Sequence, residues 1–297
     1  MIGMILVFPV AVMYGLQWPN PLFFGIPIPP AAFVAIGGVL SMTLTQAWFP
    51  EYALTWNFPT WAISTVVFFY LVFPPMVKFL ARLDHRTKWA LLALAPVVSL
   101  IPSIIYLSIV GEERPLSFWN EFIMRNPLLW LPHFMMGMLL ARIFNITRYD
   151  RSRGPGLNPR RISWGDAAAL ILLVIFLLKD EFIAKLLLMG EVSPHLILRH
   201  GLLAPLFLVV VYDLANNRGV MARLFSLPGL RQLGDTSFSI FILQFPVLIL
   251  GSIVFQNSQV DPLVRLIVVT TLTIVISLLS TMVFEKPVTR WLRRKMV

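Results

Sequence analysis

The sequence predicts an all-α protein, a polytopic transmembrane helical bundle of about eight or nine membrane helices. Hydrophobic residues make up 58% of its 297 residues and charged residues only 13%, about half the charged share of an ordinary soluble domain. The apolar residues gather in long runs, and a helix needs roughly 20 of them to cross a hydrocarbon core of about 30 Å. Lysine and arginine are concentrated in every second loop between these runs, as expected for a chain that crosses a membrane repeatedly.

The basic loops predict which side of the membrane each part of the chain occupies. Loops rich in lysine and arginine stay in the cytoplasm. The C-terminal tail is one of them, so we expect a multi-pass protein of the inner (cell) membrane with a cytoplasmic C-terminus. The basic segments are 78–88, 142–161, 218–231 and 290–295.

Each apolar run after about residue 59 lies between a basic loop and a loop poorer in lysine and arginine, so the orientation alternates without conflict. The outward loops expected on this basis are 51–61, 111–127, 190–200 and 256–262. The crossings expected, in order, are 60–78, 89–110, 127–147, 165–187, 197–215, 236–255 and 262–284.

The N-terminal part has two interpretations. Residues 1–16 are apolar, and 31–48 is long enough to cross, but prolines at 18–21 and 27–30 break the chain between them. If both runs cross, the N-terminus lies outside. If 31–48 is re-entrant or interfacial, which we prefer, the N-terminus lies inside. No basic n-region or cleavage pattern indicates a signal peptide, and we expect one transmembrane domain over 1–297.

Composition excludes several functions. The chain has no cysteine, so disulfides and thiol nucleophiles are ruled out. It has no HExxH, P-loop or GxGxxG pattern, so we expect neither a metal site nor a bound cofactor. The net charge of +10 is explained by the cytoplasmic loops, so we expect membrane lipid and no nucleic acid as a partner.

An aromatic region marks the outer boundary of the crossing at 60–78. It contains WFP (48–50), WNFPTWAIS (56–64) and FFYLVFP (68–74). One interpretation is an aromatic belt with a helix start set by proline. The other is a pocket floor where tryptophan stacks on a sugar or lipid headgroup and Asn57 supplies hydrogen bonds.

These motifs resemble the acyltransferase 3 family of integral membrane acyltransferases. Three further blocks are similar to that family in order and spacing, and together the blocks cover the chain from about Thr45 to the end. They are PLLWLPHFMMGMLLAR (127–142), LGDTSFSIFILQFP (233–246) and FEKPVTRWLR (284–293).

The resemblance implies transfer of an acyl group, commonly acetyl, to a carbohydrate at the cell envelope. The donor would be cytoplasmic acyl-CoA (acetyl-CoA) as a co-substrate, and the acceptor a glycan or lipid-linked carbohydrate. The substrate-binding candidates are Asn57, Trp61, Ser64, Tyr70, Arg142 and Gln244.

The chain also departs from the family pattern. The family's N-terminal helix with a catalytic histidine is not found, and we expect the chain to be N-terminally truncated relative to the family. Val66, Gln244 and Trp130 stand where the family has Glu, His and Arg. We therefore expect this chain alone to have little acyltransferase activity.

Acyl transfer to a hydroxyl needs a base. The few candidates each have a structural interpretation as well, so no catalytic residue is assigned. His133 is either a polar interface residue or that base. Glu285 either pairs with Arg142 or Arg290, or lies near a cytoplasmic donor pocket. We expect His195 and His200, with Arg199 between them, to anchor a boundary loop, and His85 to be solvated.

Gln244 cannot act as a base near neutral pH, but it suits a hydrogen-bond network.

The alternative to an acyltransferase is a transporter or flippase subunit for a lipid- or acyl-linked substrate. A non-catalytic membrane scaffold is a third possibility.

Overall fold

The computed structural model describes residues 22–23, 26–114, 116–151, 162–178, 195–216, 219–256 and 258–296. They divide between two compact units. The first unit holds the chain up to Gln46, Glu51–Ile63 and Pro228–Val297, and the second holds Ala47–Pro50 and Ser64–Leu227. A single domain over 1–297 stays a prediction.

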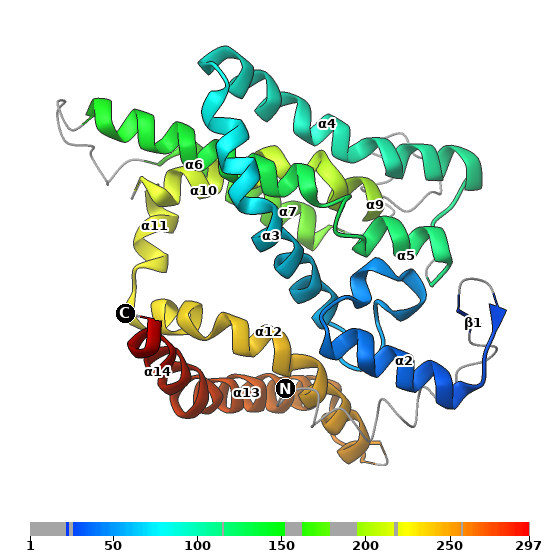
Figure 1. Ribbon diagram of the computed structural model, residues 1–297. Coiled ribbons are helices and arrows are strands. Elements are labelled where there is room, and N and C mark those ends of the chain that lie inside the picture. The colour runs from blue at the N-terminus through cyan, green and yellow to red at the C-terminus, as the bar shows by residue number, and fades with distance from the viewer. Residues whose placement is uncertain are drawn as a thin grey trace. The chain divides into compact units, whose positions relative to one another are not determined.

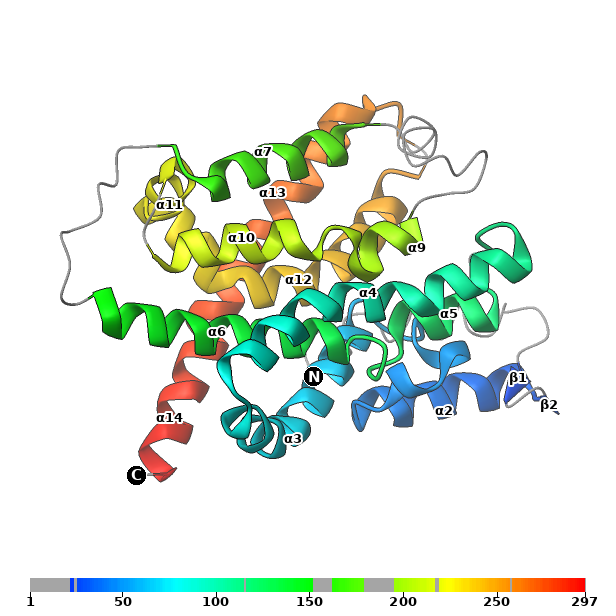
Figure 2. The same cartoon turned by 90° about the horizontal axis from the view of Figure 1, so that it is seen from above.

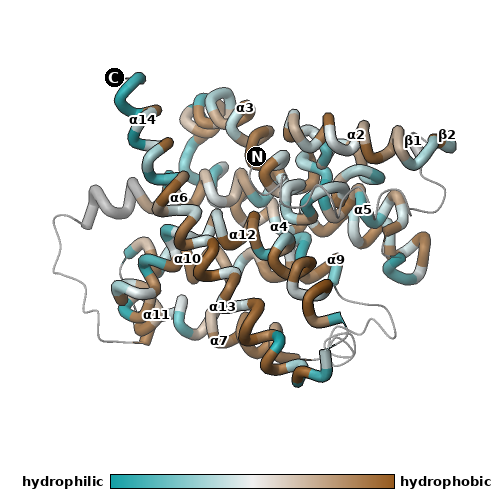
Figure 3. Tube along the Cα trace, turned by 90° about the horizontal axis from the view of Figure 1, so that it is seen from below, coloured by the Kyte–Doolittle hydropathy of each residue, from teal (hydrophilic) through white to brown (hydrophobic). Residues whose placement is uncertain are grey.

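The first unit is built mainly from two long helices at the C-terminal end. Helix α12 (Pro228–Val254) packs along α13 (Pro262–Ser280), as Figure 1 shows. A π-turn, η4 (Thr281–Glu285), joins α13 to α14 (Lys286–Met296). In Figure 3, α14 is mostly hydrophilic, whereas α13 is hydrophobic over most of its length.

The described N-terminal residues of the first unit form short elements. A two-residue ladder pairs β1 (Leu22–Phe23) with β2 (Ile26–Pro27), and α2 (Pro30–Met42) follows. Helix α2 is about 20 Å long, short of the hydrocarbon core of about 30 Å. This length favours the re-entrant or interfacial interpretation of 31–48, while the run at 1–16 lies outside the described residues.

Two 3₁₀ turns and α3 connect the units. The turns are η1 (Gln46–Trp48) and η2 (Pro50–Tyr52), and α3 (Thr60–Arg82) begins in the first unit and continues in the second. Inside η2, burial raises the pKa of Tyr52 to about 12, with a smaller contribution from Glu51.

The second unit holds α4 (His85–Val110), which packs against α6 (Leu131–Arg151), with the short α5 (Phe118–Arg125) between them in sequence. Helix α7 (Trp164–Leu177) packs on α10 (Ala204–Ala215) (Figure 2). The other elements in the described part of this unit are α9 (His195–Ile197), the π-turn η3 (Leu198–Leu202) and α11 (Gly219–Phe225).

Side-chain caps fix the helix ends in the second unit. Asp84 begins α4 by accepting hydrogen bonds from the backbone N–H groups of Arg86 (3.0 Å) and Thr87 (3.3 Å). Ser163 and Asp166 form a capping box at α7. Asp166 also accepts from the N–H groups of Val220 and Met221, which ties α7 to the start of α11.

Among the described residues, hydroxyl and other polar side chains are buried beside apolar ones, and many large apolar side chains are exposed. Hydroxyl side chains are enclosed between the helices, including Ser103 and Ser277 at 0% exposure. Large apolar side chains such as Phe176 (85% exposed) and Ile109 (79%) point outward. Membrane helices pack through small and hydroxyl-bearing residues while their apolar side chains face lipid, so this distribution supports a membrane protein.

Within the described ranges, four helices are long and apolar enough to cross a membrane, or five if a bent pair forms one span. The four are Thr60–Arg82, His85–Val110, Pro228–Val254 and Pro262–Lys295. The bent pair joins His195–Leu202 to Ala204–Ala215 at an angle of 46°. The helical membrane class is thus supported, but the expected count of about eight or nine is not confirmed.

Candidate functional site

The predicted substrate-binding residues are distributed over both units. Asn57, Trp61 and Gln244 belong to the first unit, and Ser64, Tyr70 and Arg142 to the second. Ser64 is buried and accepts a hydrogen bond from the N–H of Ala47 (3.4 Å), so its hydroxyl holds η1 against α3. Tyr70 and Arg142 are exposed. Their binding roles stay predictions.

Asn57 compensates for a proline in a helix. It is fully buried, and its Nδ2 donates to the carbonyl oxygen of Ile242 (3.1 Å). Pro246, four residues further along α12, has no N–H and leaves that carbonyl without its helical donor. The Oδ1 atom of Asn57 is buried without a partner. The ring of Phe58 stacks on Phe245 beside this contact, with centroids 5.5 Å apart.

Gln244 lies half-buried two residues before Pro246. Among the described residues, the side chain of Gln244 makes no hydrogen bond. The hydrogen-bond network expected for it therefore stays a prediction.

Glu285 is held by hydroxyl groups. Ser239 on α12 donates to its Oε1, and Thr281 donates to its Oε2 (3.3 Å). The π-turn η4 brings Thr281 and Glu285 together. The ion pair expected with Arg290 is not formed among the described residues of this unit. Hydroxyl donors on the adjacent helix and turn satisfy the carboxylate instead.

In the second unit, three rings form a cluster where the start of α6 meets η3, with His200 buried and Trp130 and His133 half-buried. Trp130 lies 4.8 Å from His200 and 5.0 Å from His133, measured between ring centroids, and the two histidines are 6.4 Å apart. All four imidazole nitrogens are buried without a hydrogen-bond partner. The cluster therefore has proton acceptors that the protein itself does not use.

His200 is enclosed by the protein rather than exposed on the loop that we expected it to anchor. It is fully buried, because the chain kinks inside η3. His200 has φ −92° and ψ 19°, and Gly201 has φ +156°. A Cβ at Gly201 would lie 2.4 Å from the carbonyl oxygen of Pro96, so only glycine allows this approach to α4. The adjacent glycine was the one sequence signal for this kink.

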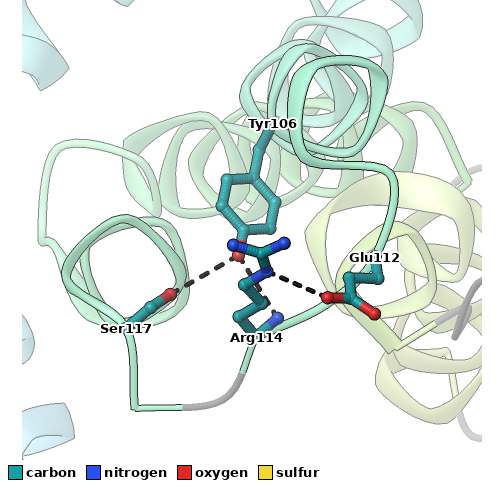
Figure 4. A network of polar contacts seen from close by, with 4 residues as sticks. All are labelled: Tyr106, Glu112, Arg114 and Ser117. Atoms are coloured by element: carbon teal, nitrogen blue, oxygen red, sulfur yellow. Dashed lines mark hydrogen bonds and ion pairs between the residues drawn. The ribbon is translucent and has the colours of Figure 1, made fainter.

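The loop after α4 holds the segment that carries His200. The N–H of Leu196 donates to Oε1 of Glu113 (2.7 Å). Figure 4 shows the neighbouring contacts, where the N–H of Arg114 donates to the Tyr106 hydroxyl (3.3 Å) and the Arg114 guanidinium pairs with Glu112 (2.9 Å). The Tyr106 hydroxyl also lies 3.4 Å from that of Ser117.

A buried ion pair stabilises α5, the helix that follows the loop after α4. Arg125 Nη1 contacts Glu121 Oε2, and both side chains are almost inaccessible. Burial lowers the pKa of Arg125, and the neighbouring Glu121 carboxylate partly offsets that effect. Trp130 is fixed from the same region, because its Nε1 donates to the carbonyl oxygen of Met124 (2.9 Å).

A cavity of about 450 Å³ opens beside the cluster. A second cavity of about 290 Å³ shares three lining residues with it, so the two are adjacent, and we call them together the groove between α6 and α10. The shared residues are His133, Phe207 and Leu208. The rest of the groove is lined mainly by apolar side chains, and Arg199 lies at the end near Trp130.

The arrangement defines a class of protein. It is a multi-pass helical membrane protein in which a buried and a half-buried histidine lie beside an apolar groove. Among the described residues, no group of three His, Asp or Glu side chains could hold a metal ion.

Comparison with known proteins identifies the family. Residues 1–282 match the acyltransferase 3 family, Acyl_transf_3, whose description is an acyltransferase domain. The chain therefore belongs to this family, as the motifs indicated. It is also similar to the acyltransferase MdmB of Streptomyces mycarofaciens, with 29% identity over 140 residues. That match covers 44% of this chain and 35% of the relative, so it spans about a third of the relative's length. No solved structure matches.

Proposed function

We propose that the protein is a membrane-bound acyltransferase that moves an acyl group, most simply acetyl, from acyl-CoA to a carbohydrate hydroxyl. The acceptor is a glycan or lipid-linked carbohydrate of the cell envelope, and the chain works in the inner membrane with its C-terminus in the cytoplasm. The observation that carries the proposal is the family match over residues 1–282. The half-buried His133, whose ring nitrogens have no hydrogen-bond partner among the described residues, supplies a candidate base in support of it.

His133 is the base in this proposal, because it lines the cavity and its ring nitrogens have no protein partner. It takes the proton from the acceptor hydroxyl, whose oxygen forms an ester bond to the acyl carbonyl carbon. The thioester of cytoplasmic acyl-CoA has to extend through the membrane to His133, near the outward end of the expected crossing at 127–147. There its C–S bond breaks, and the proton passes to the departing CoA thiolate. General-base catalysis of this kind contributes about 10²–10⁴-fold in rate.

His200 is a positioning residue in this arrangement. It is completely enclosed and lies against Trp130, with its ring 6.4 Å from that of His133. It does not line the cavity beside His133, so it acts by holding the tryptophan and limiting where the His133 ring can lie.

The test uses membranes that contain the chain, radiolabelled acetyl-CoA and an envelope glycan acceptor. We expect low turnover, since Val66 and Gln244 stand at polar family positions, and we expect His133→Ala to reduce it about 100-fold or more. His85→Ala is the matched control, because His85 is exposed and, among the described residues, accepts its hydrogen bond from the nearby Trp89 (2.9 Å).

Two results would count against the proposal. Equal label transfer by the wild type and by folded His133→Ala would remove His133 as the base. Robust transfer would instead contradict the expectation that this chain alone is a weak enzyme.

The alternative is a transporter or flippase subunit, and the groove between α6 and α10 is the observation that favours it. This alternative predicts flux of a lipid- or acyl-linked substrate in proteoliposomes without a covalent product. Substrate movement with no labelled ester would therefore replace the acyltransferase proposal.

A further inference from the structure

The groove between α6 and α10 has the dimensions of one lipid chain. It runs along α6 from the level of His133 to that of Phe144, which corresponds to about 16 Å of helix. That is about half of the 30 Å hydrocarbon core, the depth of a single leaflet. The larger of its two cavities, at about 450 Å³, far exceeds the roughly 150 Å³ that accommodates benzene.

Small residues form the floor of the groove. Gly137 and Ala141 on α6 are exposed and line it, and Ala215 lies at its far end. A Cβ placed on Gly137 would meet nothing within 4 Å, so the space above this glycine is open. Phe144 and Tyr212 close the same end with an edge-to-face contact whose centroids are 6.4 Å apart.

Charge is found at the opposite end. Arg199 lines the wider cavity and is exposed. No ion pair or hydrogen bond of its side chain is formed within the described part of the chain. An arginine at the boundary of an apolar groove is suited to a phosphate group.

We propose that this groove binds one anionic phospholipid of the surrounding membrane. The phosphate lies at Arg199, and one hydrocarbon chain lies over Gly137 and Ala141 with its end toward Phe144. Lipid binding itself requires neither a donor nor an acceptor. Because His133 lines both cavities, a lipid in this groove and an acceptor hydroxyl at His133 would exclude one another.

The lining distinguishes this occupant from the arm of acyl-CoA. That arm carries amide groups, and an amide buried without a hydrogen-bond partner is costly. Between Gly137 and Ala215, the groove offers apolar side chains and only Tyr212 as a polar one. A hydrocarbon chain needs no such partners.

The test is native mass spectrometry of the delipidated full chain in detergent, titrated with phosphatidylglycerol. The wild type should retain one lipid, and Gly137→Leu should weaken its binding at least tenfold by filling the groove. Gly234→Leu is the matched control, because Gly234 also lies in a helix with nothing within 4 Å of a Cβ, but on α12. It should bind like the wild type.

The headgroup is tested separately with Arg199→Gln and with diacylglycerol, which has the same chains but no phosphate. The wild type should prefer phosphatidylglycerol at least tenfold, and Arg199→Gln should lose this preference. Arg114→Gln is the control, because that exposed arginine already pairs with Glu112.

Unchanged binding by Gly137→Leu, or a preference that survives Arg199→Gln, would overturn the inference. Displacement of the lipid by acetyl-CoA would assign the groove to the donor and overturn it as well. If Gly137→Leu does not fold, Gly137→Ala, which adds one methyl group to the open space, should still weaken binding. All these measurements are independent of turnover, so an inactive chain leaves the inference testable.

Discussion

The side-chain amide of Asn57 donates to the carbonyl of Ile242, the group that Pro246 leaves without a helical partner. A bare carbonyl inside a membrane helix is costly, and neighbouring side chains commonly satisfy it. The contact joins residues 185 positions apart in sequence and fixes the segment before α3 against α12.

Replacing Asn57 should therefore destabilise the protein. We expect Asn57→Ala to lower the free energy of unfolding by about 1–2 kcal/mol, measured by thermal or denaturant unfolding in detergent. In Pro246→Ala the helix can supply its own N–H, so the further loss on adding Asn57→Ala should shrink. Simple additivity of the two changes would contradict this explanation.

The kink at Gly201 predicts an unusually damaging alanine substitution. Gly201→Ala places a Cβ 2.4 Å from the Pro96 carbonyl oxygen and 2.6 Å from Ser99 Oγ, at φ +156°. We expect a loss of roughly 3 kcal/mol or more in unfolding free energy.

Gly111→Ala is the control for that substitution. Gly111 ends α4 with φ +80°, but nothing lies within 4 Å of its Cβ position, so the change should cost about 1 kcal/mol. Equal losses for the two glycines would show that the close approach to α4 does not matter.

The hydroxyl contacts of Glu285 predict a difference between two neighbouring serines. Ser239 donates to the carboxylate, and removing a donor to a charged group costs about 1.5–3 kcal/mol. Ser239→Ala should therefore lower stability by about that amount, whereas Ser237→Ala, at an exposed position of the same helix, should change it by less than about 0.5 kcal/mol. A comparable effect of both serines in unfolding measurements would argue against the contact.

Asp84 predicts a pH dependence. Its side-chain hydrogen bond with Thr87, followed by the backbone N–H of Thr87, lowers its pKa below the usual 3.8. Because the pKa of Asp84 is lower in the folded than in the unfolded state, the ionised Asp84 stabilises the fold. This stabilisation is fully present above the unfolded-state pKa and is lost as the pH falls through the folded-state pKa.

The measurement is the melting temperature as a function of pH below about 4, compared between the wild type and Asp84→Asn. Asparagine also caps helices but does not titrate, so the variant should lack this part of the decline. Identical acid profiles would contradict the assignment to Asp84.

The positions of the long helices could be predicted from the sequence. The crossings expected at 60–78 and 89–110 correspond to Thr60–Arg82 and His85–Val110, and the last two correspond to α12 and α13. Hydropathy and loop charge are local properties, so they locate elements without any tertiary information. The expected crossing at 197–215 is instead bent by 46° near Gly201, because the contact with Pro96 on α4 sets the backbone there.

The candidate site was predicted less well, because its contacts are made between distant segments. His133 could be singled out as a potential base, but the burial of His200 against Trp130 depends on the fold of η3. For Glu285 the sequence left two interpretations, an ion pair with Arg142 or Arg290, or a place near a cytoplasmic donor pocket. The structure supplies hydroxyls on an adjacent helix and turn, which no local pattern distinguishes from ordinary helix-packing residues.

The enclosed hydroxyls of Ser103 and Ser277 and the outward side chains of Phe176 and Ile109 have a consequence for handling the protein. Extraction without a detergent belt would leave this oily exterior to self-associate. The protein would then aggregate before the helices that pack through these serines separate. Loss of soluble protein during purification would therefore indicate that detergent covers the apolar surface incompletely, and not that the chain has unfolded.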